Sequence, residues 1–433
     1  MNKHLSNYYG ISKANTSVKT EILAGVTTFM TMAYILAVNP NILSSTGMNR
    51  EALFTTTALA SFLATMVMAL VAKLPFALAP GMGLNAFFAF TVVLGMGHSW
   101  QFALTAVFLE GLIFIALTFL NVREKIITAI PLGVKHAISA GIGLFIAFIG
   151  LQNAGVIVKN DNVLVGLGQM DSPSVLLCLG GVLVTAVLLA RNVKGALLIG
   201  IFMTTLVGIP LGLTQLPHGG LFSLPPTIAP IAFKLEFSSI LSIDMLIVVF
   251  TFLFVDMFDT LGTLVGVASK ANMLDEKGQL PRAKQALFAD AFGTTFGALL
   301  GTSTVTTYVE SASGVAEGGR TGLTALTTAI LFILALFLSP LFLMVPAAAT
   351  APALILVGSL MITPILKINF EDLTEAIPAF LTIIMMPLTY SIAEGIVFGM
   401  LSYVLLKAFT GKIKEISLVM WILSAFFLLK FII

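Results

Sequence analysis

Two carboxylates lie three residues apart within one long apolar stretch of this chain. The run 254–266 contains Asp256 and Asp259, followed by Thr260 and Thr263, and most of the surrounding side chains are Ile, Val, Phe and Leu. On a helix these four residues fall on one face. A charged side chain at the centre of a membrane costs about 2.5–3.5 kcal/mol, and such residues usually face a cavity. The spacing therefore predicts a polar site inside a bundle of apolar helices.

The composition places this bundle in a membrane. The 433 residues are 58% hydrophobic and only 10% charged, with a mean hydropathy of +1.05, whereas soluble domains carry about 25% charged residues. The net charge of +2 argues against a nucleic-acid partner, and the single cysteine, Cys178, excludes an intrachain disulfide. We therefore expect an all-α, multi-pass membrane protein in contact with the lipid bilayer and without a cleaved signal peptide.

The apolar runs predict about fourteen transmembrane segments. They lie at 22–43, 51–72, 75–95, 100–120, 130–150, 173–190, 195–214, 243–268, 285–301, 302–317, 321–344, 348–363, 375–390 and 392–409. With a cytoplasmic N-terminus, most Lys and Arg residues fall on cytoplasmic connections, and only Arg50, Lys159 and Lys234 fall clearly outside. We expect this orientation in the cell inner (plasma) membrane. The apolar run 417–432 is either a fifteenth segment or a helix at the interface.

The third and tenth runs are not typical of continuous spanning helices. In the third, Pro75 and Pro80 bracket a stretch that cannot be regular helix, and Gly81 then opens a helical pattern. In the tenth, the β-branched and hydroxyl residues of 301–307 favour a short strand, and Glu310 follows at the start of a short helix. Irregular backbone inside a membrane is tolerated only where it is buried in protein or lines a cavity.

These two runs occupy corresponding positions, third in each set of seven. Because seven is odd, the second set starts from the opposite side of the membrane, which predicts a 7+7 inverted repeat. The fifth runs also resemble each other, since a proline precedes the Gly/Ala-rich stretches 140–150 and 353–358. Broken helices at corresponding positions of two halves are the best sequence pointer to a transporter's binding site.

Four motifs resemble the AzgA-like purine permeases, a branch of the nucleobase–cation symporters within the xanthine/uracil permease superfamily. They are Asn15-Thr-Ser-Val-Lys-Thr-Glu21, 79–88, 255–263, and 301–311 with 318–322. The resemblance covers essentially the whole chain. It implies import of hypoxanthine, guanine or adenine by proton symport, through alternating access between a core and a gate domain. The implied boundaries are a cytoplasmic N-terminal segment 1–20, a core domain 21–125 and 241–345, a gate domain 126–240 and 346–410, and a C-terminal apolar segment 411–433.

By position, the resemblance assigns substrate binding to Asn85, Asp259 and Glu310. Uracil permeases carry a histidine four residues after the eighth-segment acid, and here that position is Thr263. Recognition of a pyrimidine of that type is therefore not expected, and Thr263 should not be given the role of the histidine.

The chemistry of these side chains suits a purine base, which is flat and has N–H donors next to ring-nitrogen and carbonyl acceptors. Carboxylates accept hydrogen bonds from adjacent N–H groups, and a carboxamide offers both a donor and an acceptor. Thr263 and Thr306 add hydroxyls, while the aromatic rings of Phe87 and Tyr308 can hold the face of the base. We expect these residues to bind substrate beside the three that the resemblance assigns.

The acids are also the candidates for the coupling proton. Asp256, Asp259 and Glu310 lie in apolar runs without Lys or Arg, and burial disfavours the charged form of a carboxylate. We expect one of the three to carry the proton, with Asp259 and Glu310 ahead of Asp256 and with sodium less favoured as the coupling ion. Structural roles stay open for each: an interhelical hydrogen bond for the two aspartates and a helix cap for Glu310. The remaining buried acids, Glu110 and Asp290, are interpreted as structural.

Other classes of function fit the sequence less well. An anion transporter of the sulfate-transporter type would share the 7+7 architecture, but Asp259 and Glu310 would repel an anion. A xanthine, urate or uracil permease stays within the same class. The pair Asp256 and Asp259 resembles the Mg²⁺-binding acids of prenyl transferases, but a second acidic cluster and basic residues for a diphosphate are missing from the spans. We therefore expect no enzyme, no cofactor and no metal site. A homodimer is compatible with the sequence, which does not rank the three purines.

Overall fold

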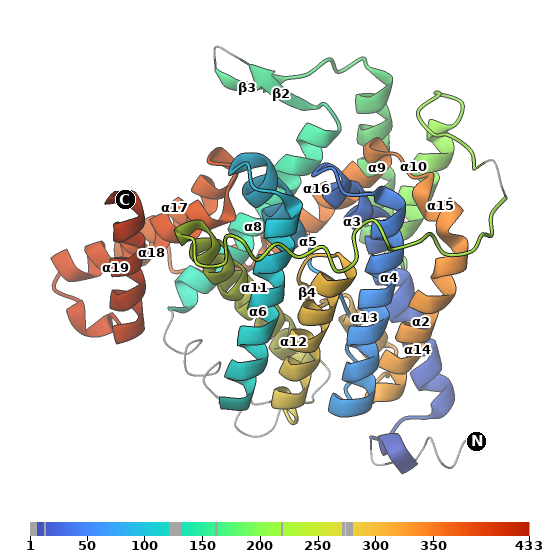
Figure 1. The fold of residues 1–433 in the computed structure, drawn as a ribbon, viewed down its shortest axis with the longest axis horizontal. Helices are drawn as coiled ribbons and strands as arrows, with labels where there is room; N and C mark the ends of the chain where they lie inside the picture. The colour runs from blue at the N-terminus through green and yellow to red at the C-terminus, as the bar shows by residue number, and fades with distance from the viewer. Residues whose placement is uncertain are drawn as a thin grey trace.

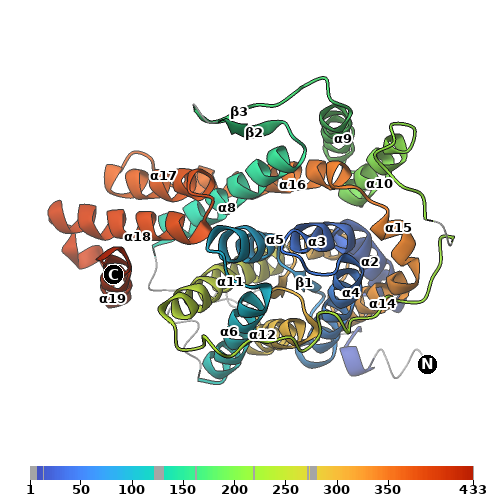
Figure 2. The same ribbon diagram turned by 45° about the horizontal axis from the view of Figure 1, so that its top comes forward.

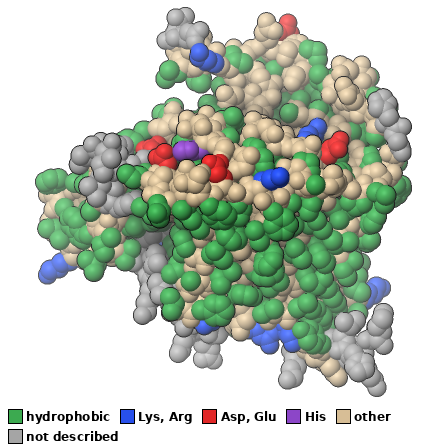
Figure 3. Space-filling model, in the orientation of Figure 1, with side chains coloured by type: hydrophobic (Ala, Val, Ile, Leu, Met, Phe, Trp, Pro, Cys, Tyr) green, Lys and Arg blue, Asp and Glu red, His purple; other side chains and the backbone are tan. Residues whose placement is uncertain are grey.

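The chain folds into a bundle of helices with the dimensions of a membrane protein. The computed structural model describes residues 7–12, 14–120, 131–160, 163–217, 220–270, 273 and 280–432, apart from some side chains of the helices α11 and α19. It is mostly helical, about 70% (Figure 1). Eight helices of this described part are long and apolar enough to cross a membrane, and three shorter apolar helices accompany them. A broad hydrophobic band separates charged side chains above and below it (Figure 3). The chain is therefore a multi-pass membrane protein.

The first half of the chain contains the segments expected from its apolar runs. In order they are α2 (Val18–Met32) with α3 (Ile35–Ser44), α4 (Arg50–Val67) with η1 (Met68–Ala72), β1 (Leu78–Pro80) with α5 (Met82–Ala86) and η2 (Phe87–Gly95), α6 (Trp100–Leu120), α8 (Leu132–Asn153), α9 (Pro173–Ala190) and α10 (Ala196–Gly208). Between α8 and α9, β2 (Ile157–Asn160) and β3 (Leu164–Leu167) pair as an antiparallel hairpin. The hairpin projects from one end of the bundle, here called the hairpin end, and the N-terminus lies at the other (Figure 1).

The second half repeats this order. It contains α11 (Ile243–Lys270), α12 (Ala283–Leu300), β4 (Val305–Thr307) with α13 (Ser311–Ala316), α14 (Gly322–Ala335) with η3 (Leu336–Leu338) and α15 (Ser339–Leu343), α16 (Ala347–Met361) with η4 (Thr363–Lys367), α17 (Leu373–Leu388) and α18 (Ile392–Phe409). The short strands expected in the third and tenth segments are present as β1 and β4. Polar side chains begin several helices, since Ser17, Asn49, Ser172 and Ser391 each accept a hydrogen bond from a backbone N–H of the first turn.

Equivalent segments of the two halves meet each other. The strands β1 and β4 pair in antiparallel register, with Ala79 opposite Thr306. The fifth segments of the halves, α8 and α16, cross where Gly143 and Gly358 face each other. A Cβ atom on Gly143 would come within 2.6 Å of the Gly358 carbonyl oxygen, so a side chain at this crossing would force the helices apart. An antiparallel meeting of equivalent elements is what a two-fold axis in the membrane plane requires.

The helices pack as two groups. The first helix group consists of α2–α6 and α11–α15 with β1 and β4, and the second consists of α8–α10 and α16–α18. Packing is dense within each group, as between α6 and α12 or between α8 and α16, and sparse between them. Figure 2 shows α8, α16, α17 and α18 running alongside the cluster formed by the first helix group.

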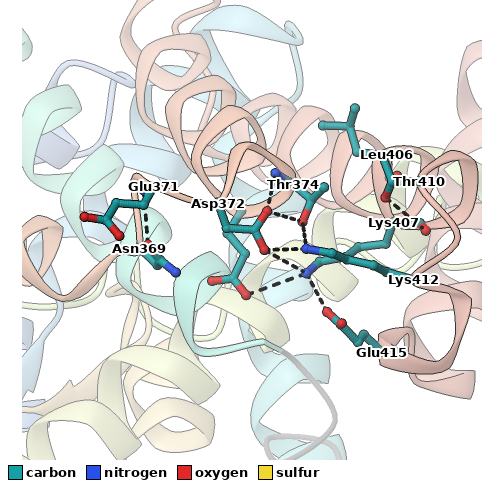
Figure 4. A network of polar contacts seen from close by, with 10 residues as sticks. Asn369, Glu371, Asp372, Thr374, Leu406, Lys407, Thr410, Lys412 and Glu415 are labelled. Carbon is teal, nitrogen blue, oxygen red and sulfur yellow. Dashed lines mark hydrogen bonds and ion pairs between the residues drawn. The ribbon is translucent and has the colours of Figure 1, made fainter.

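A network of ion pairs fixes the connection between α18 and the C-terminal helix. The fully buried Lys407 of α18 lies 2.5 Å from the Glu415 carboxylate, 3.7 Å from Glu375 and 3.8 Å from Asp372. Lys412 adds a second contact to Asp372 at 2.6 Å (Figure 4). A buried ammonium needs such partners, because an unpaired buried charge is strongly destabilising. The network joins η5 (Ile413–Glu415) to the start of α17.

Residues 417–432, for which the sequence left two interpretations, form most of one helix. This helix, α19 (Leu418–Ile432), packs against α18. The ring of Phe427 also meets Phe250 of α11, with centroids 5.6 Å apart and nearly perpendicular planes. The C-terminal helix therefore contacts both helix groups.

Candidate functional site

The strand pair β1–β4 lies fully buried in the middle of the first helix group. Beyond the ladder, the Tyr308 N–H donates to the Ala77 carbonyl at 2.9 Å, and the Gly81 N–H donates to Thr304 at 3.0 Å. Gly81 allows the strands to approach, because a Cβ atom there would lie 2.5 Å from Cγ2 of Thr306. Each strand then leads into a short helix, α5 or α13. Two broken segments therefore share one small sheet.

Threonines of neighbouring helices satisfy the free edges of this sheet. Thr65 of α4 exchanges two hydrogen bonds with the Leu78 backbone, at 2.9 and 3.0 Å. Thr294 of α12 does the same for Val305, at 2.9 and 3.3 Å. Thr65 and Thr294 lie on the second segment of each half, so the arrangement obeys the inverted repeat. Unpaired backbone groups in an apolar interior are costly, and these hydroxyls remove that cost.

Asp259 and Glu310, the two acids expected at the site, both lie beside the strand pair. Both are half-buried. Glu310 precedes α13, and its Oε1 accepts a hydrogen bond from the Tyr34 hydroxyl at 2.7 Å. Asp259 Oδ2 lies 3.7 Å from the Cβ position of Gly81. Among the described residues, no hydrogen-bond donor reaches the side chain of Asp259. The two carboxylates thus border the starts of α5 and α13, where helix dipoles and free N–H groups favour negative charge.

Asp256 lies one turn before Asp259 in a separate, fully buried polar cluster. The Thr260 hydroxyl is 3.0 Å from Asp256 Oδ1, 2.7 Å from Asp290 Oδ1 of α12 and 2.8 Å from the Thr306 hydroxyl of β4. Asp290, interpreted from the sequence as structural, therefore shares the Thr260 hydroxyl with Asp256. Asp256 and Asp290 are here called the diacid. The cluster therefore connects α11 and α12 to β4, the strand that leads into the half-helix α13.

Asn85 is fully buried on α5 and lies next to the tenth segment. Its Oδ1 accepts a short hydrogen bond from the Ser303 hydroxyl. Its Nδ2 group has no hydrogen-bond partner among the described residues. Since a buried donor without an acceptor costs about 1–3 kcal/mol, this amide is available for an acceptor atom that the described residues do not supply.

The aromatic and hydroxyl candidates differ in their surroundings. Phe87 is buried and packs edge-to-face on Phe252, with centroids 4.8 Å apart. Tyr308 is also buried, and its hydroxyl donates to the Pro80 carbonyl at 2.5 Å. The Thr306 hydroxyl lies 2.8 Å from the Thr260 hydroxyl, within hydrogen-bond distance. Thr263 is half-buried and its hydroxyl makes no hydrogen bond to another described residue.

Sequence reasoning missed three contacts of the site because each joins distant segments. Tyr34 lies in the first segment within an apolar run, and nothing local distinguishes it from a packing residue. Glu110, interpreted as structural, accepts a hydrogen bond from the Thr304 hydroxyl at 2.6 Å. Glu21, quoted only as part of a motif, is fully buried and accepts hydrogen bonds from the backbone and side chains of Thr321 and Thr324 at the start of α14. The Glu21 carboxylate therefore caps the N-terminus of α14.

Within the described part of the chain, no three His, Cys, Asp or Glu side chains come together as a metal site would require. The polar groups at the strand pair are instead single acceptors and donors near the starts of the two half-helices. They suit a small organic molecule with several hydrogen-bonding groups.

A membrane bundle with two inverted halves, in which paired half-helices meet beside buried acids, defines a secondary transporter fold. Residues 19–398 match the permease family whose name refers to xanthine and uracil permeases. The chain belongs to this family, the nucleobase–cation symporter-2 family.

Characterised and putative permeases resemble the chain over its whole length. It is 52% identical to a putative permease of Methanocaldococcus jannaschii, covering 99% of this chain and 98% of the relative. It is 49% identical to the guanine/hypoxanthine permease PbuG of Bacillus subtilis, covering 99% of both. It is 45% identical to the adenine permease AdeP of Escherichia coli, covering 99% of this chain and 96% of the relative.

Among solved structures, the transmembrane domain of the cyanobacterial bicarbonate transporter BicA has a similar fold. The TM-score is 0.66 at 18% sequence identity, covering 88% of this chain and 96% of that domain. This likeness shows the fold, a 7+7 inverted repeat.

Proposed function

We propose that this permease imports the purine nucleobases hypoxanthine, guanine or adenine by proton symport. The observation that carries the proposal is the position of Asp259 and Glu310 beside the starts of the two half-helices. Two acceptors at this junction match the N–H groups of a neutral purine, and relatives at 45–49% identity are named as adenine and guanine/hypoxanthine permeases.

The base would be held between the acids and Asn85. Carboxylate oxygens of Asp259 and Glu310 accept from its N–H groups, and Nδ2 of Asn85 donates to a ring nitrogen or carbonyl. The free N–H groups at the starts of α5 and α13 supply further donors. The hydroxyl of Thr263 is available, and the ring of Tyr308 borders the same junction. Phe87 directly follows α5 and packs against Phe252 of α11, which supports the position of α5.

The Thr260 cluster is a second place where a proton can reside. Three short oxygen–oxygen contacts meet at the Thr260 hydroxyl, which has one proton of its own to donate. The hydroxyls of Thr260 and Thr306 supply two protons, and a proton on Asp256 or Asp290 would complete the third hydrogen bond. This count supports a protonated diacid one turn behind Asp259. We propose that the coupling proton moves between this diacid and the substrate carboxylates.

Alternating access would use the two helix groups, with the first as the core domain and the second as the gate domain. At the hairpin end, Thr91 donates to the Tyr390 carbonyl at 3.2 Å, and Asn41 donates to Thr350 at 3.4 Å. At the opposite end, Lys194 forms an ion pair with Glu317. Each contact joins one group to the other, so opening either end breaks one set. We propose that the hairpin end faces outward and the N-terminus lies in the cytoplasm.

The test is uptake of labelled hypoxanthine in cells that lack their own purine permeases, with unlabelled adenine, guanine, xanthine and uracil as competitors. A protonophore should abolish accumulation, and the three favoured purines should compete while uracil should not. Absence of uptake for every purine would refute purine transport. Uptake that responds to sodium rather than to the protonophore would refute proton coupling.

A further inference from the structure

Tyr34 lies at a third irregularity of the membrane segments. The first segment is interrupted between α2 and α3, and Ala33 and Tyr34 form the turn between them. The Tyr34 side chain is only 1% exposed. Its hydroxyl lies 2.7 Å from Glu310 Oε1, and 3.5 Å from the sulfur of Met82, the first residue of α5. One phenol therefore contacts the starts of both half-helices.

The Tyr34 hydroxyl donates a hydrogen bond to Oε1 of Glu310. With Glu310 ionised this is the only direction open to the bond, because a carboxylate carries no proton. Bonds of this kind to a charged acceptor are stronger than neutral ones, and the bond fixes the orientation of the glutamate. Among the described residues, Tyr34 is the one side chain that donates to this carboxylate. Oε2 of Glu310 therefore receives no hydrogen bond from another described side chain.

We infer that Tyr34 determines which purine is preferred, because its hydroxyl competes with the base for Oε1 of Glu310. This inference rests on the proposed function and deepens it. Guanine presents two adjacent donors, the ring N1–H and the exocyclic amino group, and would use both oxygens of a free carboxylate. Hypoxanthine presents only N1–H on that edge, and adenine presents its amino group next to an acceptor nitrogen. Because the phenol competes for Oε1 and fixes the carboxylate for its own bond, guanine loses much of the advantage of its second donor.

Removing the phenol oxygen in Tyr34→Phe should therefore favour guanine. Guanine would gain a second hydrogen bond to the charged carboxylate, while adenine gains none. One such bond changes affinity on the order of tenfold. The expected result is a shift of about tenfold in the ratio of inhibition constants for guanine and adenine, with the guanine value falling. Loss of a merely structural contact would weaken both purines together and leave their ratio unchanged.

Glu310→Gln provides a second test that does not depend on how Tyr34→Phe folds. If the Tyr34 hydroxyl keeps donating, its acceptor becomes the amide oxygen, and the amide N–H groups then point toward the base. An N–H donor suits the ring acceptor of adenine and opposes the N1–H of guanine, so the ratio should move toward adenine. In the double variant the amide is no longer oriented, and this preference should decrease.

The experiment compares wild type, Tyr34→Phe, Glu310→Gln and the double variant for competition of hypoxanthine uptake by guanine and adenine. Purine-induced thermal stabilisation of the detergent-solubilised protein replaces uptake for any variant that binds without transporting. Tyr403→Phe, a buried tyrosine of α18 away from the strand pair, is the matched control and should keep the wild-type ratio. Ratios within twofold of wild type in both single variants would overturn the inference. A wild type that takes up no purine would instead overturn the proposed function.

Discussion

Replacing Gly81 by alanine tests whether the close approach of the two broken segments is necessary for binding. The added methyl group would lie 2.5 Å from Cγ2 of Thr306, 3.2 Å from Leu84 and 3.7 Å from the Asp259 carboxylate. The first distance is far inside van der Waals contact, so either the Thr306 side chain or the backbone around Gly81 must shift. Overpacking of this kind typically costs about 1–3 kcal/mol. If this free-energy cost is paid on binding rather than on folding, the KM for a purine rises by about 5- to 150-fold.

The assay is initial-rate uptake, with protein in the membrane quantified for each variant. Gly180→Ala on α9 is the control, because its added methyl meets nothing within 4 Å. Thr306→Ser is the rescue, since it removes the clashing methyl group and keeps the hydroxyl that contacts Thr260. The double variant Gly81→Ala, Thr306→Ser should regain most of the lost affinity. A Gly81→Ala protein with a wild-type KM, or a defect that Thr306→Ser leaves untouched, would refute this account of the strand pair.

Three further predictions concern the acids. Asp259→Asn should reduce uptake by about tenfold to a hundredfold, the value of one to two hydrogen bonds to a charged acceptor, and a variant with wild-type uptake would remove Asp259 from the site. Glu21→Ala should lower the free energy of unfolding by about 3 kcal/mol or more, because the buried donors of Thr321 and Thr324 lose their acceptor; thermal unfolding in detergent measures this. The Lys412 ammonium holds the pKa of Asp372 below its usual value of 3.8, so the carboxylate's stabilising contribution is complete above that pH and is lost as the pH falls below it. Asp372→Asn should remove this acid dependence from thermal unfolding as the pH is lowered from about 5 toward 2, and an unchanged dependence would contradict it.

The sequence predicts the membrane segments and the two breaks because these depend on local composition. Pro75 and Pro80 bracket a six-residue stretch and interrupt its regular helix, and the hydroxyl-rich residues 301–307 favour an extended backbone. The partners of the polar side chains depend on which segments meet, and spacing along the chain carries no such information. Tyr34 is therefore indistinguishable in the sequence from a packing residue of an apolar run, although its hydroxyl contacts Glu310, 276 positions away. Asp256 and Asp290 likewise lie on different helices, α11 and α12, and meet only through the hydroxyl of Thr260.

The inverted repeat explains the scaffold of the site, and the departures from it explain the chemistry. The two halves supply equivalent strands, and Thr65 and Thr294 satisfy their edges in the same way. The half-helices that follow are not equivalent, because α5 carries the amide of Asn85 while Glu310 precedes α13. A symmetric pair of acids would present only acceptors, whereas a purine edge combines donors with acceptors. An amide on one half-helix and a carboxylate beside the other can match both kinds of group. Binding of a neutral base, as proposed, therefore uses unlike side chains at these two positions, while the backbone around them keeps the symmetry.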